Sequence, residues 1–167
     1  MTDRPLGLDT LAIHAATAPD PATGARQVPI YQTTAYVFRD ADHAAKLFNL
    51  QEVGYIYSRL TNPTVSALAN RVVALEGGAG GIACSSGHAA QIMALFPIMA
   101  PGRNVVASTR LYGGTIQQFS NTIRKFGWSA KFVDFDDPKA IEAAIDADTR
   151  AIFCETICNP GGAISDL

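Results

Sequence analysis

Cysteine is scarce in this sequence of 167 residues. The three cysteines are Cys84, Cys154 and Cys158, and none of them stands in the CxxC spacing of a zinc or redox site. Their odd number also excludes a framework in which every cysteine is paired within the chain. The sequence therefore predicts no metal site, and it predicts reduced thiols that are mostly buried.

Long apolar runs and an excess of charge of one sign are missing as well. No stretch approaches the roughly eighteen consecutive apolar residues of a membrane span, and the N-terminus lacks the apolar centre of a signal peptide. A net charge of -2 gives no broad attraction to nucleic acid or to an anionic membrane. We therefore expect a cytoplasmic protein with neither nucleic acid nor membrane as a partner. Hydrophobic residues at 48% fit one folded domain.

Regular periodicity is absent from residues 1 to about 39, which are rich in Pro, Gly, Thr and Asp. So long an irregular segment predicts an extended N-terminal arm whose apolar side chains need the surface of a partner subunit. Asp40 is a candidate cap for a short helix that ends near Gly54. Residues 1–61 are therefore predicted to form an arm and a short helix that make contacts between subunits.

From Asn62 onward the pattern is that of an α/β fold. Asn62 and Pro63 supply a cap and a first-turn proline for a helix that Gly77 and Gly78 end. Predicted strands at 81–85, 104–108, 130–135 and 151–155 then alternate with predicted helices at 87–99, 114–126 and 138–145. Segments 104–108 and 151–155 are apolar on both faces, which predicts a mostly parallel sheet with helices on both sides.

Ligands of such sheets bind beyond the carboxyl ends of the strands, so the residues there are candidate site residues. Ser86, Gly87 and His88 form a small-residue turn at the start of a helix, where free N–H groups and the positive helix end would hold a phosphate. A tight turn without a ligand explains the same residues. The turn matches neither the dinucleotide fingerprint nor the P-loop pattern.

Three further motifs each have two interpretations. Tyr112, beside two glycines, suits stacking on a flat heteroaromatic ring, or it packs half-buried over its own helix. Asn159 is placed to bond a ring hydroxyl, or the Asn-Pro pair is only a turn. Tyr57 and Arg59 suit a phosphate, or they are a packing tyrosine and a solvated arginine.

Taken together, YSRLTNPT, SSGHAAQ, RLYGGT and ETICNP resemble the transsulfuration family of pyridoxal-phosphate (PLP) enzymes, from about Thr10 to the end of the chain. The arm and the stretch LFNLQEVGYIYSRLTNPT are most similar to the O-acetylhomoserine sulfhydrylase branch. The resemblance implies the PLP-dependent transferase fold type I, which is aspartate-aminotransferase-like. Residues 62–167 would be the incomplete front part of its large PLP-binding domain.

The resemblance also implies roles for the candidate residues. Ser86, Gly87 and His88 would hold the cofactor phosphate through backbone N–H groups, and Tyr57 and Arg59 would reach the phosphate in a neighbouring subunit. Met or Gln commonly follows the glycine in the family, so the purpose of the His88 side chain stays open.

The ring of the cofactor would be held by residues that follow two other strands. Tyr112 would stack on it and act catalytically by moving protons, Asn159 would contact its hydroxyl, and Glu155 would shape the loop.

The family's Schiff-base lysine, and the aspartate that pairs with the ring nitrogen, would lie beyond residue 167. Lys46, Lys125, Lys131 and Lys139 are interpreted as solvated charges, so these residues alone are expected to be inactive.

By resemblance, the activity is γ-replacement on O-acetylhomoserine with sulfide or a thiol, forming homocysteine or methionine. A longer chain in a homotetramer, built from dimers that share active sites, would perform it. Methionine γ-lyase and cystathionine γ-synthase or γ-lyase activities are the alternatives within the family. A short non-catalytic remnant that serves as a binding or assembly partner is another. A nucleotide-binding α/β domain would explain the phosphate turn but neither the Tyr57 and Arg59 pair nor Tyr112.

Overall fold

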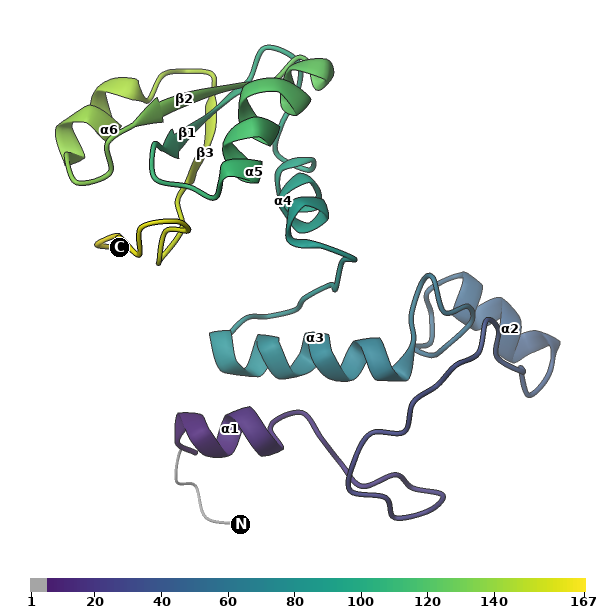
Figure 1. The fold of residues 1–167 in the computed structure, drawn as a ribbon. Coiled ribbons are helices and arrows are strands. Elements are labelled where there is room, and N and C mark those ends of the chain that lie inside the picture. Colours follow the sequence, from purple (N-terminus) through teal and green to yellow (C-terminus); the bar gives the residue numbers. More distant parts are fainter. Residues whose placement is uncertain (1–5) are drawn as a thin grey trace. The chain divides into compact units, whose positions relative to one another are not determined.

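The computed structural model describes residues 6–167, so the first five residues of the predicted arm lie outside the described residues. The chain forms two compact units, of which one reaches to Ala83 and the other begins at Cys84 (Figure 1). The predicted division of the chain before Asn62 stays a prediction. Thr64, at the start of a helix, is tied to the preceding segment: its hydroxyl accepts from Tyr31 N (3.0 Å) and donates to Pro29 O (3.0 Å).

The described residues of the first unit, 6–83, form three helices: α1 (Leu8–His14), α2 (Ala41–Phe48) and α3 (Pro63–Glu76). Two predicted caps are present. The Asp40 carboxylate accepts from His43 N (2.7 Å), and the Asn62 side chain accepts from Thr64 N (2.9 Å). Helix α3 ends at Gly77, whose φ of 64° favours glycine. Helix α2 ends earlier than predicted, because the chain turns through Leu50 at a φ of 57°.

The prediction of an irregular arm is wrong for Leu8–His14, which form helix α1. A seven-residue helix is marginal alone and needs contacts from elsewhere in the fold. Arg71 of α3 supplies them: its Nε donates to Ala15 O (2.6 Å) and its Nη1 to Ala12 O (2.7 Å), at the carbonyl end of α1. These contacts join residues more than fifty positions apart, so no local pattern reveals them.

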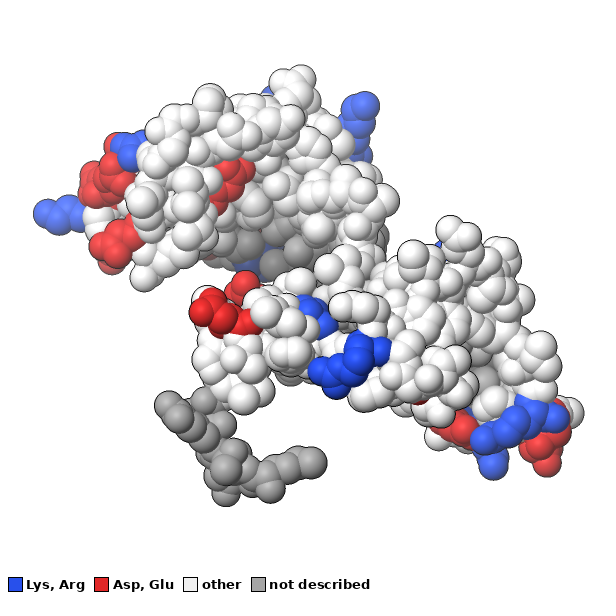
Figure 2. Space-filling view, turned by 60° about the horizontal axis from the view of Figure 1, so that its bottom comes forward, with Lys and Arg blue, Asp and Glu red and all other residues white. Residues whose placement is uncertain are grey.

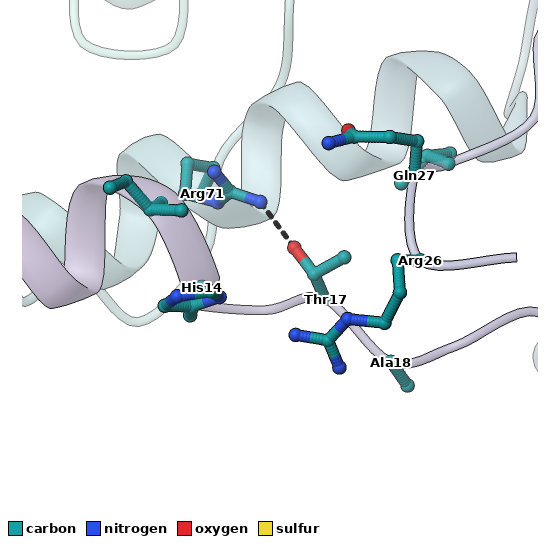
Figure 3. Close-up of a pocket in the computed structure, with 8 residues that line it drawn as sticks. His14, Thr17, Ala18, Arg26, Gln27 and Arg71 are labelled. Atoms are coloured by element: carbon teal, nitrogen blue, oxygen red, sulfur yellow. Dashed lines mark hydrogen bonds between the residues drawn. The ribbon is translucent and has the colours of Figure 1, made fainter.

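Arg71 also lies at a cavity of about 560 Å³ in this unit. Figure 3 shows its guanidinium donating to the hydroxyl of Thr17. The lining residues are Ile13, His14, Thr17, Ala18, Arg26, Gln27, Val28 and Arg71. Since Arg71 donates to three groups of the α1 region, its observed role is to fasten α1 to α3.

The second unit has the predicted α/β alternation. Its elements are α4 (Gly87–Leu95), β1 (Asn104–Ser108), α5 (Gly113–Gln117), β2 (Ser129–Val133), α6 (Pro138–Ala144) and β3 (Thr149–Phe153). Between α5 and β2 the chain continues as a π-helical turn η1 (Gln118–Thr122) and a 3₁₀ turn η2 (Ile123–Phe126), so the predicted helix 114–126 forms but changes its winding. The three strands form one parallel sheet in the order β2-β1-β3 (Figure 1).

The predicted strand at 81–85 is not a strand. Ile82 is 75% exposed, and within the described part of the chain residues 81–85 pair with no sheet. Strand β1 already has β2 and β3 as its two neighbours, so it offers no free edge. Apolar β-rich composition favours extended backbone, but a strand also needs a partner for its N–H and C=O groups.

Burial of the strands follows their place in the sheet. The central strand β1 is buried along its whole length, as predicted. The prediction that 151–155 is covered on both faces is wrong: β3 lies at the sheet edge, and Ile152 is 53% exposed while Ala151 and Phe153 pack on the core. The core consists of Leu95, Met99, Val105, Ala107, Leu111, Phe119, Ile123 and Trp128.

Asp146, in the loop between α6 and β3, joins three parts of the second unit. Its carboxylate accepts from Lys131 Nζ (2.5 Å) and Asn104 Nδ2 (2.9 Å), and from the backbone N of Asp148 (2.9 Å). Lys131 is therefore paired, in contrast to the solvated charge that the sequence suggested. The hydrogen bond from Lys131, followed by that from Asn104, holds the pKa of Asp146 well below its ordinary value.

We expect Asp146→Asn to make the second unit less sensitive to acid. A carboxyl whose pKa is lowered by folding stabilises the native state above its unfolded pKa of about 4, and this stabilisation is lost as pH falls. Between about pH 5 and pH 3 the free energy of unfolding should therefore fall less steeply in the variant than in the parent, as measured by urea unfolding. Glu142→Gln is the control, since Glu142 is an exposed carboxylate on the adjacent helix α6. Equal slopes for parent and Asp146→Asn would contradict the assignment.

Candidate functional site

The entrance of helix α4 carries the predicted phosphate turn. Ser86 caps the helix: its hydroxyl accepts from Ala89 N (3.1 Å) and its carbonyl from Ala90 N (3.0 Å). The N–H groups of Gly87 and His88 have no partner among the residues that the structure describes, and no acidic residue lies in the first turn. Two free donors at the positive end of a helix suit an anion.

This entrance is open. A Cβ built on Gly87 would meet no atom within 4 Å, apart from its immediate chain neighbours. Gly87 and His88 are also both exposed, so the start of the helix is accessible within the described part of the second unit. Exposed, unpaired N–H groups at a helix start favour a bound anion over a turn without a ligand.

Tyr112 follows β1 and is the residue before α5. Tyr112 is 49% exposed, and its ring stacks on the ring of His88 with a centroid distance of 5.8 Å and an interplanar angle of 28°. Gly114 lies directly beside both rings, because a Cβ there would come within 2.6 Å of an atom of each. The stacking partner from α4 distinguishes this arrangement from a tyrosine that packs only on its own helix.

Glu155 connects the loops that follow β1 and β3. Its Oε1 accepts from Tyr112 N (2.9 Å) and its Oε2 from Asn159 N (3.4 Å). The hydroxyl of Ser165 donates to its carbonyl (2.8 Å). The carboxyl ends of neighbouring parallel strands meet at one edge of the sheet, which is why one carboxylate reaches both loops. Glu155 thus connects Tyr112 and Asn159 through their backbone N–H groups, while the roles predicted for these residues stay predictions.

Helices α4 and α5 are tied together by residues that sequence reasoning missed. Gln91 Nε2 donates to the hydroxyl of the buried Thr115 (3.0 Å), and Gln118 Nε2 donates to His88 O (3.2 Å). The available signal was glutamine and threonine on otherwise apolar helix faces, because buried polar side chains require partners. These bonds fix the backbone at His88 relative to the segment that follows Tyr112.

Tyr57 and Arg59 belong to the first unit, and the other predicted site residues belong to the second. Tyr57 pairs with Ala35 in an isolated antiparallel bridge. The Arg59 Cζ atom lies 5.4 Å from the centroid of the Tyr57 ring, within the range of a cation–π contact. Both side chains are exposed, so their phenol and guanidinium are available together to an anion from outside the unit.

Charge on the protein surface is mixed in sign. On the face drawn in Figure 2, Lys and Arg side chains lie near Asp and Glu side chains. Arg39 and Glu52 form one ion pair of the first unit (3.0 Å). Within residues 6–167 no helix has the length and apolar character needed to cross a bilayer.

Comparison with known proteins places this geometry in a family. The model of the family described as "Cys/Met metabolism PLP-dependent enzyme" matches residues 9–167. Homocysteine synthase of Schizosaccharomyces pombe is 51% identical over 159 residues, and O-acetyl-L-homoserine sulfhydrylase of Leptospira meyeri is 49% identical over 152 residues. These alignments cover 95% and 91% of this chain.

A solved structure of a putative O-acetylhomoserine (thiol)-lyase from Campylobacter jejuni has a TM-score of 0.90 and 46% identity, covering 97% of this chain and 40% of that one. That structure carries N'-pyridoxyl-lysine-5'-monophosphate. The chain spans only 37% and 34% of the length of the two curated relatives. The match over almost every residue, together with the fold type I architecture, shows that the chain belongs to the PLP-dependent enzyme family of cysteine and methionine metabolism.

Proposed function

We propose that a protein containing this chain catalyses γ-replacement on O-acetylhomoserine with sulfide or a thiol, forming homocysteine or methionine. The supporting observation is the identity of 49–51% to a homocysteine synthase and an O-acetyl-L-homoserine sulfhydrylase over almost all of these residues. The chain corresponds to about a third of those proteins, so the proposal concerns these residues as part of a larger catalytic unit.

The phosphate of PLP is proposed to bind at the entrance of α4. The residues fit this group, since Gly87 and His88 offer free N–H donors, Ser86 caps the helix, and nothing fills the space beside Gly87. The exposed guanidinium of Arg59 and the phenol of Tyr57 are proposed to reach the phosphate bound to a neighbouring subunit. Bonds from a guanidinium to a phosphate are charge-assisted and therefore among the stronger hydrogen bonds.

The ring of PLP is proposed to lie against the exposed half of Tyr112. The bound cofactor would supply an electron sink for the substrate's carbanion. The Tyr112 phenol would move protons, the Asn159 amide would hold the ring hydroxyl, and Glu155 would keep both loops in place through the two N–H groups it accepts from. The amine that anchors the cofactor is proposed to come from outside these residues, because Lys46, Lys125 and Lys139 lie in helical segments and Lys131 is engaged by Asp146.

The arm is proposed to pack on a neighbouring subunit in a homotetramer built from dimers that share active sites. Its supporting observation is the exposure of large apolar side chains in the first unit, including Ile30, Val37 and Val53. An amino-acid substrate and a cytoplasmic location complete the proposal.

An activity assay tests the proposal. The protein containing this chain, supplied with PLP, O-acetylhomoserine and sulfide, should form homocysteine and acetate in equal amounts, measured by mass spectrometry. Formation of a 2-oxo acid and ammonia from methionine, without replacement, would identify a γ-lyase instead. Retention of a nucleotide in place of PLP would reject the family mechanism for this chain.

A further inference from the structure

Asn62 is a buried polar residue with more than one task. It is 7% exposed, and its Oδ1 caps α3 by accepting from Thr64 N (2.9 Å). Its Nδ2 lies within hydrogen-bond distance of Tyr31 O (2.9 Å), Ser58 Oγ (3.0 Å) and Tyr36 Oη (3.2 Å). A helix cap requires only the oxygen, so the amide nitrogen performs a second function.

Ser58 is the residue through which that amide nitrogen reaches Tyr57 and Arg59. Ser58 stands between them in the chain, its N donates to Thr34 O (2.9 Å), and its hydroxyl donates to Thr33 O. Ser58 is partly buried against this network while the side chains on either side of it are exposed. Holding Ser58 therefore determines the direction in which its two neighbours leave the backbone.

The backbone next to Ser58 is closed into a turn. Tyr57 O accepts from Leu60 N (2.8 Å) and Thr61 N (3.1 Å), and Thr61 directly precedes Asn62. Tyr57 and Arg59 are thus held at one end by the bridge to Ala35 and at the other by the cap of α3. Their side chains lie together, with the 5.4 Å separation between guanidinium carbon and ring centroid.

We propose that Asn62 is a positioning residue that presets Tyr57 and Arg59 for the cofactor phosphate through Ser58. A pair already held in its binding geometry loses less conformational freedom when the phosphate arrives. This inference rests on the proposed function, in which Tyr57 and Arg59 contact that phosphate. In this proposal the Nδ2 group of Asn62 supports cofactor affinity, and its Oδ1 atom caps helix α3.

Asn62→Ser separates the two tasks, because serine is an equally good cap but has no amide nitrogen. In the full protein, titrated with PLP and followed by its visible absorbance, we expect Asn62→Ser to weaken cofactor affinity about threefold to tenfold. Arg59→Gln, which removes a charge-assisted contact, should weaken it about tenfold to a hundredfold. In the Arg59→Gln background, Asn62→Ser should cost clearly less affinity, since one of the two side chains being positioned is gone.

Asp40→Ser is the matched control, because it replaces the cap residue of α2 in the same unit, where the side chain accepts from His43 N. It should leave PLP affinity unchanged. Unchanged affinity in Asn62→Ser, or the same loss with and without Arg59, would overturn the positioning role while the phosphate contact of Arg59 stands. Unchanged affinity in Arg59→Gln would overturn both. If Asn62→Ser fails to fold, Ser58→Ala carries the same expectations.

Discussion

Phe119→Ala should lower the free energy of unfolding of the second unit by about 3–5 kcal/mol, the range for removing a buried aromatic side chain. Phe119 is 1% exposed and lies in the core beside β1. Its ring meets Phe153 of β3 edge-on, with centroids 4.9 Å apart and an interplanar angle of 69°. The substitution would remove both the buried area and this aromatic pair, which joins η1 to the sheet.

Urea unfolding followed by circular dichroism measures this loss. Phe96→Ala is the matched control, since Phe96 belongs to the same unit but is 61% exposed, with its ring centroid 6.0 Å from that of Trp128. It should cost much less than Phe119→Ala. Similar losses for the two variants would show that η1 is not held to the sheet by Phe119.

Features that depend on neighbours in sequence could be predicted. The caps at Asp40 and Asn62 join a side-chain oxygen to an N–H two or three residues away, so the local sequence contains both partners. The same holds for the free N–H groups after Ser86, because the first N–H groups of any helix lack partners within it. The strand–helix alternation was also readable, since it follows from short-range periodicity.

Features that depend on distant partners could not be predicted. Helix α1 requires Arg71, and the strand expected at 81–85 requires a neighbouring strand, with which these residues do not pair in the described part of the chain. The link that Glu155 makes from Asn159 to Tyr112 was not foreseen, because the sequence gives no register between the loops of different strands. Local patterns indicate which residues are polar or apolar, and the fold decides which of them meet.

Gly114→Ala is expected to weaken PLP binding about fivefold to a hundredfold, which corresponds to the roughly 1–3 kcal/mol cost of overpacking. The new Cβ would lie 2.6 Å from His88 Cε1 and from Tyr112 Cε1, closer than atoms can approach, so the stacked rings must separate. Both rings are exposed, so they can move without unfolding the unit. The loss should therefore appear in a spectroscopic PLP titration of the full protein, with little change in its thermal unfolding.

Gly113→Ala is the control for this prediction. Gly113 is the adjacent residue of the same helix, and a Cβ there would meet no atom within 4 Å. Alanine is also the better helix former, so Gly113→Ala should be neutral or slightly stabilising and should leave PLP affinity intact. Equal affinities in the two variants would show that the orientation of Tyr112 against His88 does not matter for the cofactor. A loss confined to Gly114→Ala would identify the ring of Tyr112, held by its contact with α4, as part of the binding surface.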